Sequence, residues 1–314
     1  MPISPLMALG AGICSAIAMF SIVFGSVLAL PLFYLAPLPL YLAGLGIGGQ
    51  GAIIAAVAAV VTSGLIGGAY AALPFAIAYG LPVVTVCRQA LQTSPSNTGQ
   101  PEWQPFGNVI GSLTFFGMAT IVIAAFMTIN DETLGPLDQE VISFLGQALA
   151  SMQGNIPSEA RDALVAGLAP FFPGMAIASW IVMHIVNASA AQGVLVKSGR
   201  NIRPAVSFVK LTLPDWCSWL LVAAGLLAVL APGDWGYIGQ NLVIVALVPF
   251  FLLGLAVVHT FARSLAGGTW MLICFYVLIV VLGWASFLVA GIGILEQWVG
   301  LRKHARTTRN QETE

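Results

Sequence analysis

The sequence predicts an all-α, polytopic integral membrane protein with about 8–10 transmembrane helices, since each span needs about 20 apolar residues. Of the 314 residues, 59% are hydrophobic and only 7% are charged, whereas soluble domains carry roughly 25% charged residues. So little polar surface would not cover a globule in water. The apolar residues also fall into long runs that Pro, Gly and short polar loops separate, which is typical of successive membrane spans.

Composition and motifs exclude several classes of protein. The net charge of -1 does not imply a nucleic-acid partner. The four cysteines stand singly beside apolar segments, so we interpret them as small buried hydrophobes rather than metal ligands. The glycine run from residue 44 to 51 follows an apolar run rather than a strand, which argues against a phosphate loop. The sequence therefore predicts no catalytic residue, cofactor or metal, and the protein is not expected to be an enzyme.

The N-terminal half predicts five spans. A proline-rich stretch, residues 31–39, follows the first span and is expected to be an irregular connector, because proline cannot continue a helix. The glycines at 44–51 predict a tight reversal before an alanine-rich span, whose small residues favour close helix packing. The expected spans are Leu6–Leu30, Leu38–Ile47, Ala52–Leu65, Ala71–Leu91 and Asn108–Ile129.

Residues 131–168 differ from the rest of the chain and predict an extracytoplasmic insertion of amphipathic helices. Apolar residues recur there at helical spacing with polar residues between them, a pattern typical of an interfacial helix. A second short helix is expected over Glu159–Leu168, with Ser158 as its cap. Half of the chain's 12 acidic residues lie in this segment against one base, Arg161: Asp131, Glu132, Asp138, Glu140, Glu159 and Asp162.

The C-terminal half predicts spans over Met175–Val196, Asp215–Leu230 and Gln240–Ala262. The last apolar stretch, Thr269–Val299, is too long for one straight span. It forms either one long tilted helix or two shorter helices folded at Gly283. Residues 1–300 are expected to form a single transmembrane domain, and residues 301–314 a polar cytoplasmic tail.

Lysine and arginine placement predicts the orientation in a bacterial inner (plasma) membrane. Cytoplasmic loops carry an excess of these residues. With the N-terminus inside, Arg88, the basic loop at 197–210 and Arg263 all fall on the cytoplasmic side, and the acidic insertion falls outside. The basic tail obeys the same rule only if Thr269–Val299 folds back, so the hairpin at Gly283 is favoured.

Three residues of the sixth span form the candidate ligand site. Trp180, His184 and Asn187 follow i, i+4, i+7 spacing and therefore share one helix face. Polar groups at membrane depth are costly and often mark a functional site. The alternative is that His184 and Asn187 only join this helix to a neighbour by hydrogen bonds, each worth about 0.6–2 kcal/mol.

Asp215 and His259 form the candidate structural polar pair. Both lie near the same side of the membrane in the predicted topology. Asp215 opens a span, where a carboxylate can accept a backbone N–H and is stabilised by the helix dipole. The expectation is that it is held either by the N–H of Trp216 or by His259, and a proton relay through His259 is a further interpretation.

Five stretches carry a family resemblance: Ala36–Val57, the region of Asn187 with Arg203 and Pro204, Leu213–Trp216, Gly254–Arg263 and Gly293–Lys303. They resemble the YybS-like predicted membrane proteins, a family of unassigned function. The first four spans, with the small-residue stretch Ala8–Ala18, are also similar to the substrate-binding subunits of energy-coupling-factor vitamin transporters. Such subunits dock a membrane coupling protein through small-residue surfaces.

Two functions from different classes follow from these observations. The first is a transport-related membrane protein that binds a small, mostly apolar solute and docks a membrane coupling protein, as the second resemblance implies. The second is a non-transporting scaffold or assembly factor. A cavity that holds His184 and Asn187 would favour the first function, and a packed bundle with a flat apolar flank would favour the second. The bilayer is the one certain partner in both.

Overall fold

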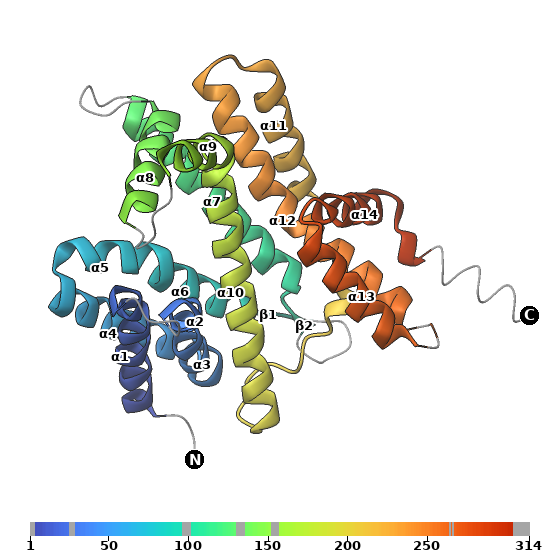
Figure 1. Ribbon diagram of the computed structural model, residues 1–314. Coiled ribbons are helices and arrows are strands. Elements are labelled where there is room, and N and C mark those ends of the chain that lie inside the picture. The colour runs from blue at the N-terminus through green and yellow to red at the C-terminus, as the bar shows by residue number, and fades with distance from the viewer. Residues whose placement is uncertain are drawn as a thin grey trace, which may run out of the picture. The chain divides into compact units, whose positions relative to one another are not determined.

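The computed structural model describes residues 4–24, 29–95, 102–129, 136–151, 157–263, 265 and 267–303. The described chain is helical apart from loops and one short hairpin, so the predicted all-α class is confirmed (Figure 1). It divides into two compact units, a division absent from the prediction of one domain over 1–300. The N-terminal unit comprises Met1–Leu113 and Val182–Ser207, and the C-terminal unit comprises Thr114–Ile181 and Phe208–Glu314.

The N-terminal unit begins with α1 (Pro5–Phe20), α2 (Ala29–Leu35) and α3 (Pro37–Ile47). The predicted irregular connector at 31–39 is wrong, because α2 and α3 take it up almost entirely. Pro37 is the first residue of α3, a position where its missing N–H costs no helical hydrogen bond. Only Ala36 separates the two helices, and together they make an apolar stretch of 19 residues.

A tight reversal joins α3 to α4 (Gly49–Gly67), as the glycines predict. Gly48 has a φ of +107°, which other residues rarely adopt. The next span is one apolar stretch of 22 residues with an irregular middle: α5 (Ala69–Phe75), a π-helical segment labelled η2 (Ala76–Gly80), and α6 (Leu81–Ala90). Pro74 and Pro82 flank this π segment.

Two segments that the sequence placed in loops or at the interface follow α6. A two-residue hairpin of β1 (Thr93–Ser94) and β2 (Glu102–Trp103) is antiparallel and leads into α7 (Phe106–Ile129). The amphipathic helices are α8 (Leu137–Ser151) and α9 (Ser158–Leu168). Their buried contacts are made by Leu145, Val165 and Ala169. Asp131, Glu132 and Met152 lie outside the described residues.

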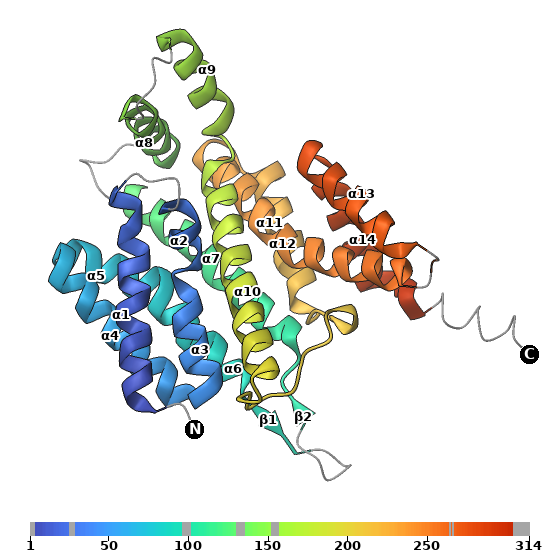
Figure 2. The same ribbon diagram turned by 60° about the horizontal axis from the view of Figure 1, so that its bottom comes forward.

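The remaining helices are α10 (Phe172–Lys197), α11 (Trp216–Leu230), α12 (Asp234–Ala262), α13 (Gly268–Val281) and α14 (Ala285–Val299). A bend at 282–284 divides the last apolar stretch (Figure 2), so the alternative of one long helix is wrong and the break near Gly283 is confirmed. α13 and α14 span about 21 and 22 Å at 1.5 Å per residue. Each is shorter than a hydrocarbon core of about 30 Å.

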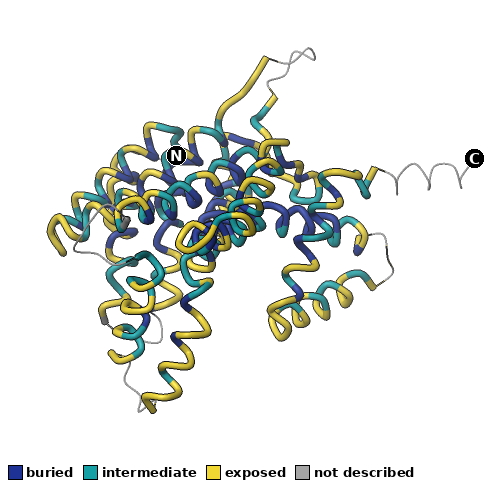
Figure 3. Tube along the Cα trace, turned by 90° about the horizontal axis from the view of Figure 1, so that it is seen from above, coloured by how far each residue is buried: buried dark blue, intermediate teal, exposed yellow. Residues whose placement is uncertain are grey.

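The C-terminal unit is built around α12, which carries more buried residues than any other helix of the unit. Backbones come close where α12 meets α14: a Cβ at Gly254 would collide with the Val289 carbonyl, and one at Gly293 with the Phe250 carbonyl. By contrast, α13 has no buried residue. Most of its residues are exposed, and the half-buried ones share one helix face: Gly268, Leu272, Phe275 and Ile279 (Figure 3). Among the described residues, seven helices are long and apolar enough to cross a membrane, and α11, α13 and α14 are shorter apolar helices.

Candidate functional site

His184 lies near the middle of α10 and is fully buried. Its ring joins two other parts of the N-terminal unit. Nδ1 lies 2.9 Å from the Tyr41 hydroxyl of α3, and Nε2 lies 2.9 Å from the carbonyl oxygen of Ala78 in the π segment. A carbonyl only accepts, so Nε2 carries the proton and the neutral ring accepts the Tyr41 proton at Nδ1. Both ring nitrogens are therefore used inside the protein.

The carbonyl that His184 contacts is one that a proline affects. In an α-helix the N–H of residue 82 would donate to the carbonyl of residue 78, but Pro82 has no N–H. The chain responds with a wide turn, in which the Leu81 N–H donates to the Ala76 carbonyl, and His184 supplies a donor to Ala78. A polar side chain thus satisfies a backbone group where no water is at hand.

Asn187 has the same role one turn further along α10. Its Nδ2 donates to the Tyr34 carbonyl, at the end of α2, and to the Met183 carbonyl, both at 2.8 Å. Ser15 similarly donates to the Ala36 carbonyl between α2 and α3. Asn187 is 2% exposed, and its Oδ1 has no partner among the described residues. The stapling interpretation of His184 and Asn187 is the one that these contacts favour.

Trp180, the third predicted site residue, has other neighbours. It belongs to the part of α10 that lies in the C-terminal unit and stacks on Phe116 of α7, with ring centroids 5.7 Å apart and planes at 25°. Offset stacking of this kind is a packing contact. Trp180 thus packs on α7, whereas His184 and Asn187 contact backbone carbonyls of the N-terminal unit. A shared solute site of these three residues stays a prediction.

The structure does not bring Asp215 and His259 together. Asp215 precedes α11 without a side-chain cap, and its Oδ1 accepts from Gln297 Nε2 at 3.3 Å. His259 Nδ1 lies 2.8 Å from the Leu255 carbonyl, and its Nε2 lies 3.4 Å from the Tyr276 hydroxyl. The pair was predicted because both residues lie near the same side of the membrane in the predicted topology, and that topology does not show that Gln297 of α14 contacts Asp215.

The C-terminal motif instead forms a polar cluster with the loop before α11. Arg302 Nε and Glu296 Oε1 are 2.7 Å apart, and both side chains are largely buried. The guanidinium also donates to the carbonyls of Val209 and Leu211 at 2.6 and 2.7 Å. Gln297 donates to the Leu213 carbonyl. Two of the motifs that carried the family resemblance, Leu213–Trp216 and Gly293–Lys303, thus lie in contact.

Arg203 is a buried arginine that the sequence identified as part of a basic topology loop and of a motif that carries the family resemblance. It donates to the carbonyls of Ala90 and Gln104 at 2.9 and 2.8 Å and lies 6.0 Å from the Trp103 ring centroid. Burial lowers the pKa of its guanidinium from the ordinary value. Because Ala90 ends α6, Arg203 closes a helix C-terminus, where cations are favoured. Arg203 therefore joins the loop after α10 to the end of α6 and to the residue that follows β2.

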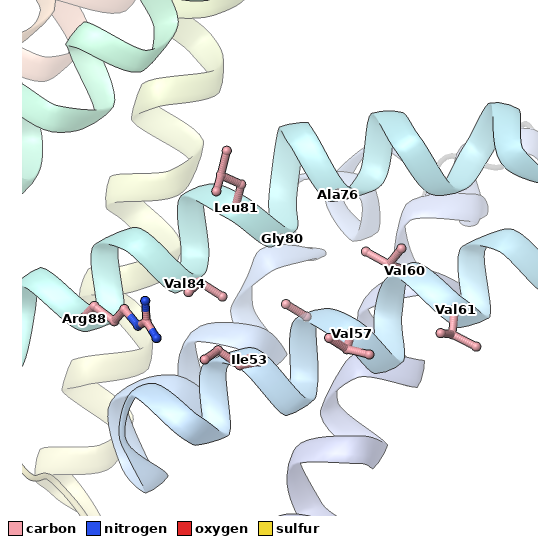
Figure 4. Close-up of a pocket in the computed structure, with 10 residues that line it drawn as sticks. Ile53, Val57, Val60, Val61, Ala76, Gly80, Leu81, Val84 and Arg88 are labelled. Carbon is pink, nitrogen blue, oxygen red and sulfur yellow. The ribbon is translucent and has the colours of Figure 1, made fainter.

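An apolar groove of about 470 Å³ lies on the N-terminal unit between α4 and the kinked helix α5–η2–α6 (Figure 4). Its volume is in the range of small-molecule sites. It is open along one side, since Val57, Val61 and Leu81 are about half exposed. The lining residues are Ile53, Ala56, Val57, Val60, Val61, Ala76, Gly80, Leu81, Val84 and Arg88.

The π segment connects this groove to His184. Ala76 and Gly80 line the groove, while Ala78, between them in the chain, offers its carbonyl to His184. His184 therefore positions one wall of the groove from behind without lining it. The wall is also held by Tyr79, which stacks on Phe75 with centroids 5.0 Å apart.

Sequence reasoning missed the groove, although one signal for it was present. Pro74, Gly80 and Pro82 within one span predict a deformed helix, and a deformed helix packs imperfectly against a straight neighbour. Small residues on α4 were interpreted as a packing surface, which Ala52, Ala55 and Ala59 do form. Which valines remain uncovered depends on the tertiary packing and not on the periodicity.

The small-residue face of α1 is occupied inside the N-terminal unit. Ala8, Gly12, Ser15 and Ala16 are buried, and a Cβ at Gly12 would collide with the Ala55 carbonyl of α4. This is the stretch in which the resemblance to energy-coupling-factor subunits implied a docking surface. The structure gives that face a partner within the chain.

Comparison with known proteins places the chain at the level of a family. A family of predicted membrane proteins, DUF2232, matches residues 13–296. No curated protein and no solved structure matches the chain, so the comparisons lend no support to the likeness to energy-coupling-factor subunits. The expected membership of a predicted membrane protein family is confirmed. Because the match covers most of the sequence, the protein belongs to the DUF2232 family of predicted membrane proteins.

Proposed function

We propose that this protein is a transport-related protein of the bacterial inner membrane whose N-terminal unit binds a small, mostly apolar solute between α4 and α5–η2–α6. The observation that carries the proposal is the groove of about 470 Å³, lined by apolar side chains and a single charge. Sites for small molecules usually combine a concave apolar wall with few polar groups. A solute held there would be in contact with the bilayer along the open side.

The groove supports this function better than the polar cluster on α10 does. His184 has both ring nitrogens engaged, and Asn187 Nδ2 is committed to two carbonyls. A solute would have to break these bonds, which contribute about 0.6–1.7 kcal/mol each in membrane proteins, before its own contacts could stabilise the complex. A solute in the groove would not have to break these hydrogen bonds. Binding there requires only that apolar surface be covered.

A membrane coupling protein belongs to this proposal as the partner that would energise transport. It would dock on a surface other than the small-residue face of α1, since that face packs on α4. The proposed orientation keeps Arg88 and the basic loop at 197–210 on the cytoplasmic side.

A non-transporting scaffold is the second candidate, and α13 is the observation that favours it. This helix is apolar throughout, and none of its residues is buried. A helix that is apolar on every side is normally surrounded by lipid or by other helices. In a scaffold, α13 would be the flank that another membrane protein covers, and the groove would hold no specific solute.

The first experiment fills the groove and measures what the protein retains. A Cβ at Gly80 would make ordinary contacts of 3.7 Å with Ala56 and 3.8 Å with Val60, so Gly80→Leu places its remaining side-chain atoms in the groove without a backbone clash. We expect wild-type protein purified in mild detergent to carry a small apolar molecule, identified by native mass spectrometry. Gly80→Leu should lose most of it.

The matched control is Gly10→Leu on α1, in the same unit. A Cβ at Gly10 meets no atom within 4 Å, and the variant should retain the molecule at the wild-type level. Equal retention by Gly80→Leu and Gly10→Leu, or no retained molecule in any of the three proteins, would contradict binding in the groove. In either case the scaffold would become the better function.

A further inference from the structure

The single charged residue of the groove points to a class of ligand. Resting on the proposed binding function, we propose that the groove takes one acyl chain of an anionic phospholipid whose phosphate lies at Arg88. The proposed ligand thus has a negatively charged head group at Arg88, and its acyl chain runs from there along the groove.

Arg88 is the one residue of the groove that can recognise a charge. It lies in the last turn of α6 and is exposed. Among the described residues it has no hydrogen bond or ion pair, in contrast to Arg203 and Arg302. No acidic residue lines the groove, so an anion would meet no repulsion there. Arginine presents a fork of N–H donors that suits phosphate oxygens.

The Arg88 side chain is held across the end of the groove rather than extended away from it. A Cβ at Gly49 would lie 3.4 Å from its Cγ and 3.9 Å from its Nε, so the aliphatic stem packs over the first residue of α4. Figure 4 shows the side chain reaching from α6 toward α4 beside Ile53 and Val84. The guanidinium therefore lies near the start of α4.

The start of α4 adds a second, weaker attraction for an anion. Gly48 provides no side-chain cap, and the first intrahelical N–H of α4 to find a carbonyl is that of Ala52, which donates to Gly48. The N–H groups before it are the ones that a helix leaves unsatisfied, and the dipole favours negative charge at this end. The charge of Arg88 makes the main contribution to binding of the phosphate, and the N-terminus of α4 adds a smaller attraction.

The length and the opening of the groove match one acyl chain. From Gly49 beside Arg88 to Val61 at the other end, α4 rises about 18 Å at 1.5 Å per residue. One leaflet is half of a hydrocarbon core of about 30 Å, so a chain whose head group lies at Arg88 would run along the groove for the depth of its leaflet. The exposed side chains of Val57 and Val61 leave the groove open to lipid along this path.

The test measures which lipid touches the far end of the groove. A photo-crosslinking residue, p-benzoylphenylalanine, replaces Val61, and the full-length protein is reconstituted in vesicles of equal amounts of phosphatidylglycerol and phosphatidylcholine with the same acyl chains. Mass spectrometry then gives the ratio of the two lipid adducts. Because one basic residue near the membrane surface favours anionic lipid by about 1 kcal/mol, we expect phosphatidylglycerol adducts to exceed phosphatidylcholine adducts about fivefold.

Matched variants separate this inference from general attraction to anionic lipid. The same probe at Ile17, an exposed position of α1, should give a ratio near one. Arg88→Gln should bring the ratio at position 61 close to one, Arg88→Lys should keep most of the preference, and Arg263→Gln, an exposed arginine that follows α12, should leave it unchanged.

The outcomes distinguish this inference from the function on which it rests. If position 61 is crosslinked to both lipids equally, with no effect of Arg88→Gln but a loss of adduct in Gly80→Leu, the groove binds apolar chains and the anionic head group is wrong. If Gly80→Leu leaves the adduct yield at position 61 unchanged, the groove is not a binding site and both proposals fail. A fivefold preference that Arg88→Gln removes would support both.

Discussion

Both units of this protein join their helices by buried neutral side chains, such as Asn241 in the C-terminal unit, but only the C-terminal unit adds a largely buried ion pair among the described residues. In the N-terminal unit the deepest contacts are neutral: His184 with Tyr41 and Ala78, and Asn187 with Tyr34. In the C-terminal unit the strongest is an ion pair between Glu296, in the last turn of α14, and Arg302, which follows that helix. Charges are costly in hydrocarbon, whereas neutral donors to backbone carbonyls are not. The position of a residue along a span thus determines whether a charged or a neutral polar contact is favourable there.

The cysteines allow the two units to be followed separately. Cys87 lies in the N-terminal unit and Cys217 in the C-terminal unit, and both are buried. Cys14 and Cys274 are exposed, so the interpretation of all four cysteines as buried is wrong for these two. In a background that lacks the exposed pair and one of the buried pair, the remaining thiol reacts with a maleimide dye only when its own unit opens. The following predictions use this readout in mild detergent.

The largest effect is expected in the C-terminal unit, from Arg302→Met. The substitution leaves Glu296 buried without its cation and removes two donors to carbonyls. Loss of one partner of a buried ion pair costs about 3–5 kcal/mol, so Cys217 should become reactive at a much lower temperature. Cys87 should respond much less.

Lys210→Met is the control, because Lys210 is exposed and lies between the two residues whose carbonyls Arg302 contacts. It should leave the Cys217 transition near the wild-type temperature. A shift in Lys210→Met as large as that in Arg302→Met would show that the charged pair is not what holds this unit.

A smaller effect is expected in the N-terminal unit, from His184→Phe. Phenylalanine keeps an aromatic ring but has neither ring nitrogen, so the change removes the two hydrogen bonds, which in membranes average about 0.6 kcal/mol and reach about 1.7 kcal/mol each. Cys87 should become reactive at a moderately lower temperature. Tyr41→Phe and the double variant complete a cycle, and their coupling should lie in the same range. A coupling near zero would mean that the Tyr41 contact does not contribute to stability.

The smallest effect is expected for Asp215→Asn. Asp215 is exposed, and its contact with Gln297 is a long one at 3.3 Å, which an asparagine oxygen can replace. We expect a change of the Cys217 transition that corresponds to less than about 0.5 kcal/mol, as for ordinary surface substitutions. A loss comparable to that of Arg302→Met would restore a charged role for this aspartate, of the kind that the sequence suggested with His259.

The sequence predicted the spans well because hydrophobic length is a property of the chain itself. α4, α7, α10 and α12 lie where the apolar runs placed them, and the break near Gly283 was favoured by the basic tail. The prediction of an irregular connector at 31–39 was wrong because it treated every proline as a helix breaker. A proline in the first turn of a helix is compatible with that helix, as Pro37 is in α3. The composition of a segment does not show where in a helix its prolines will lie.

The site was predicted less well, for a related reason. The sequence identified His184 and Asn187 as unusual, which they are, but their role depends on contacts with carbonyls of other helices, those of Ala78 and Tyr34. Tyr41, Ala78 and Tyr34 are between 106 and 153 positions away from their partners in sequence. No periodicity links such residues. The groove escaped prediction altogether, since it consists of ordinary valines that the tertiary packing leaves uncovered.

The π segment Ala76–Gly80 also bears on how this helix tolerates changes in length. A π turn inside an α-helix accommodates one extra residue locally, so the flanking helices keep their faces. Deletion of one residue here, such as Ile77, would leave α5 and α6 in phase with each other. The same deletion at Thr85 would rotate Arg88 by about 100° around α6 and carry it off the groove. Two single-residue deletions eight positions apart would thus have opposite consequences for the same arginine.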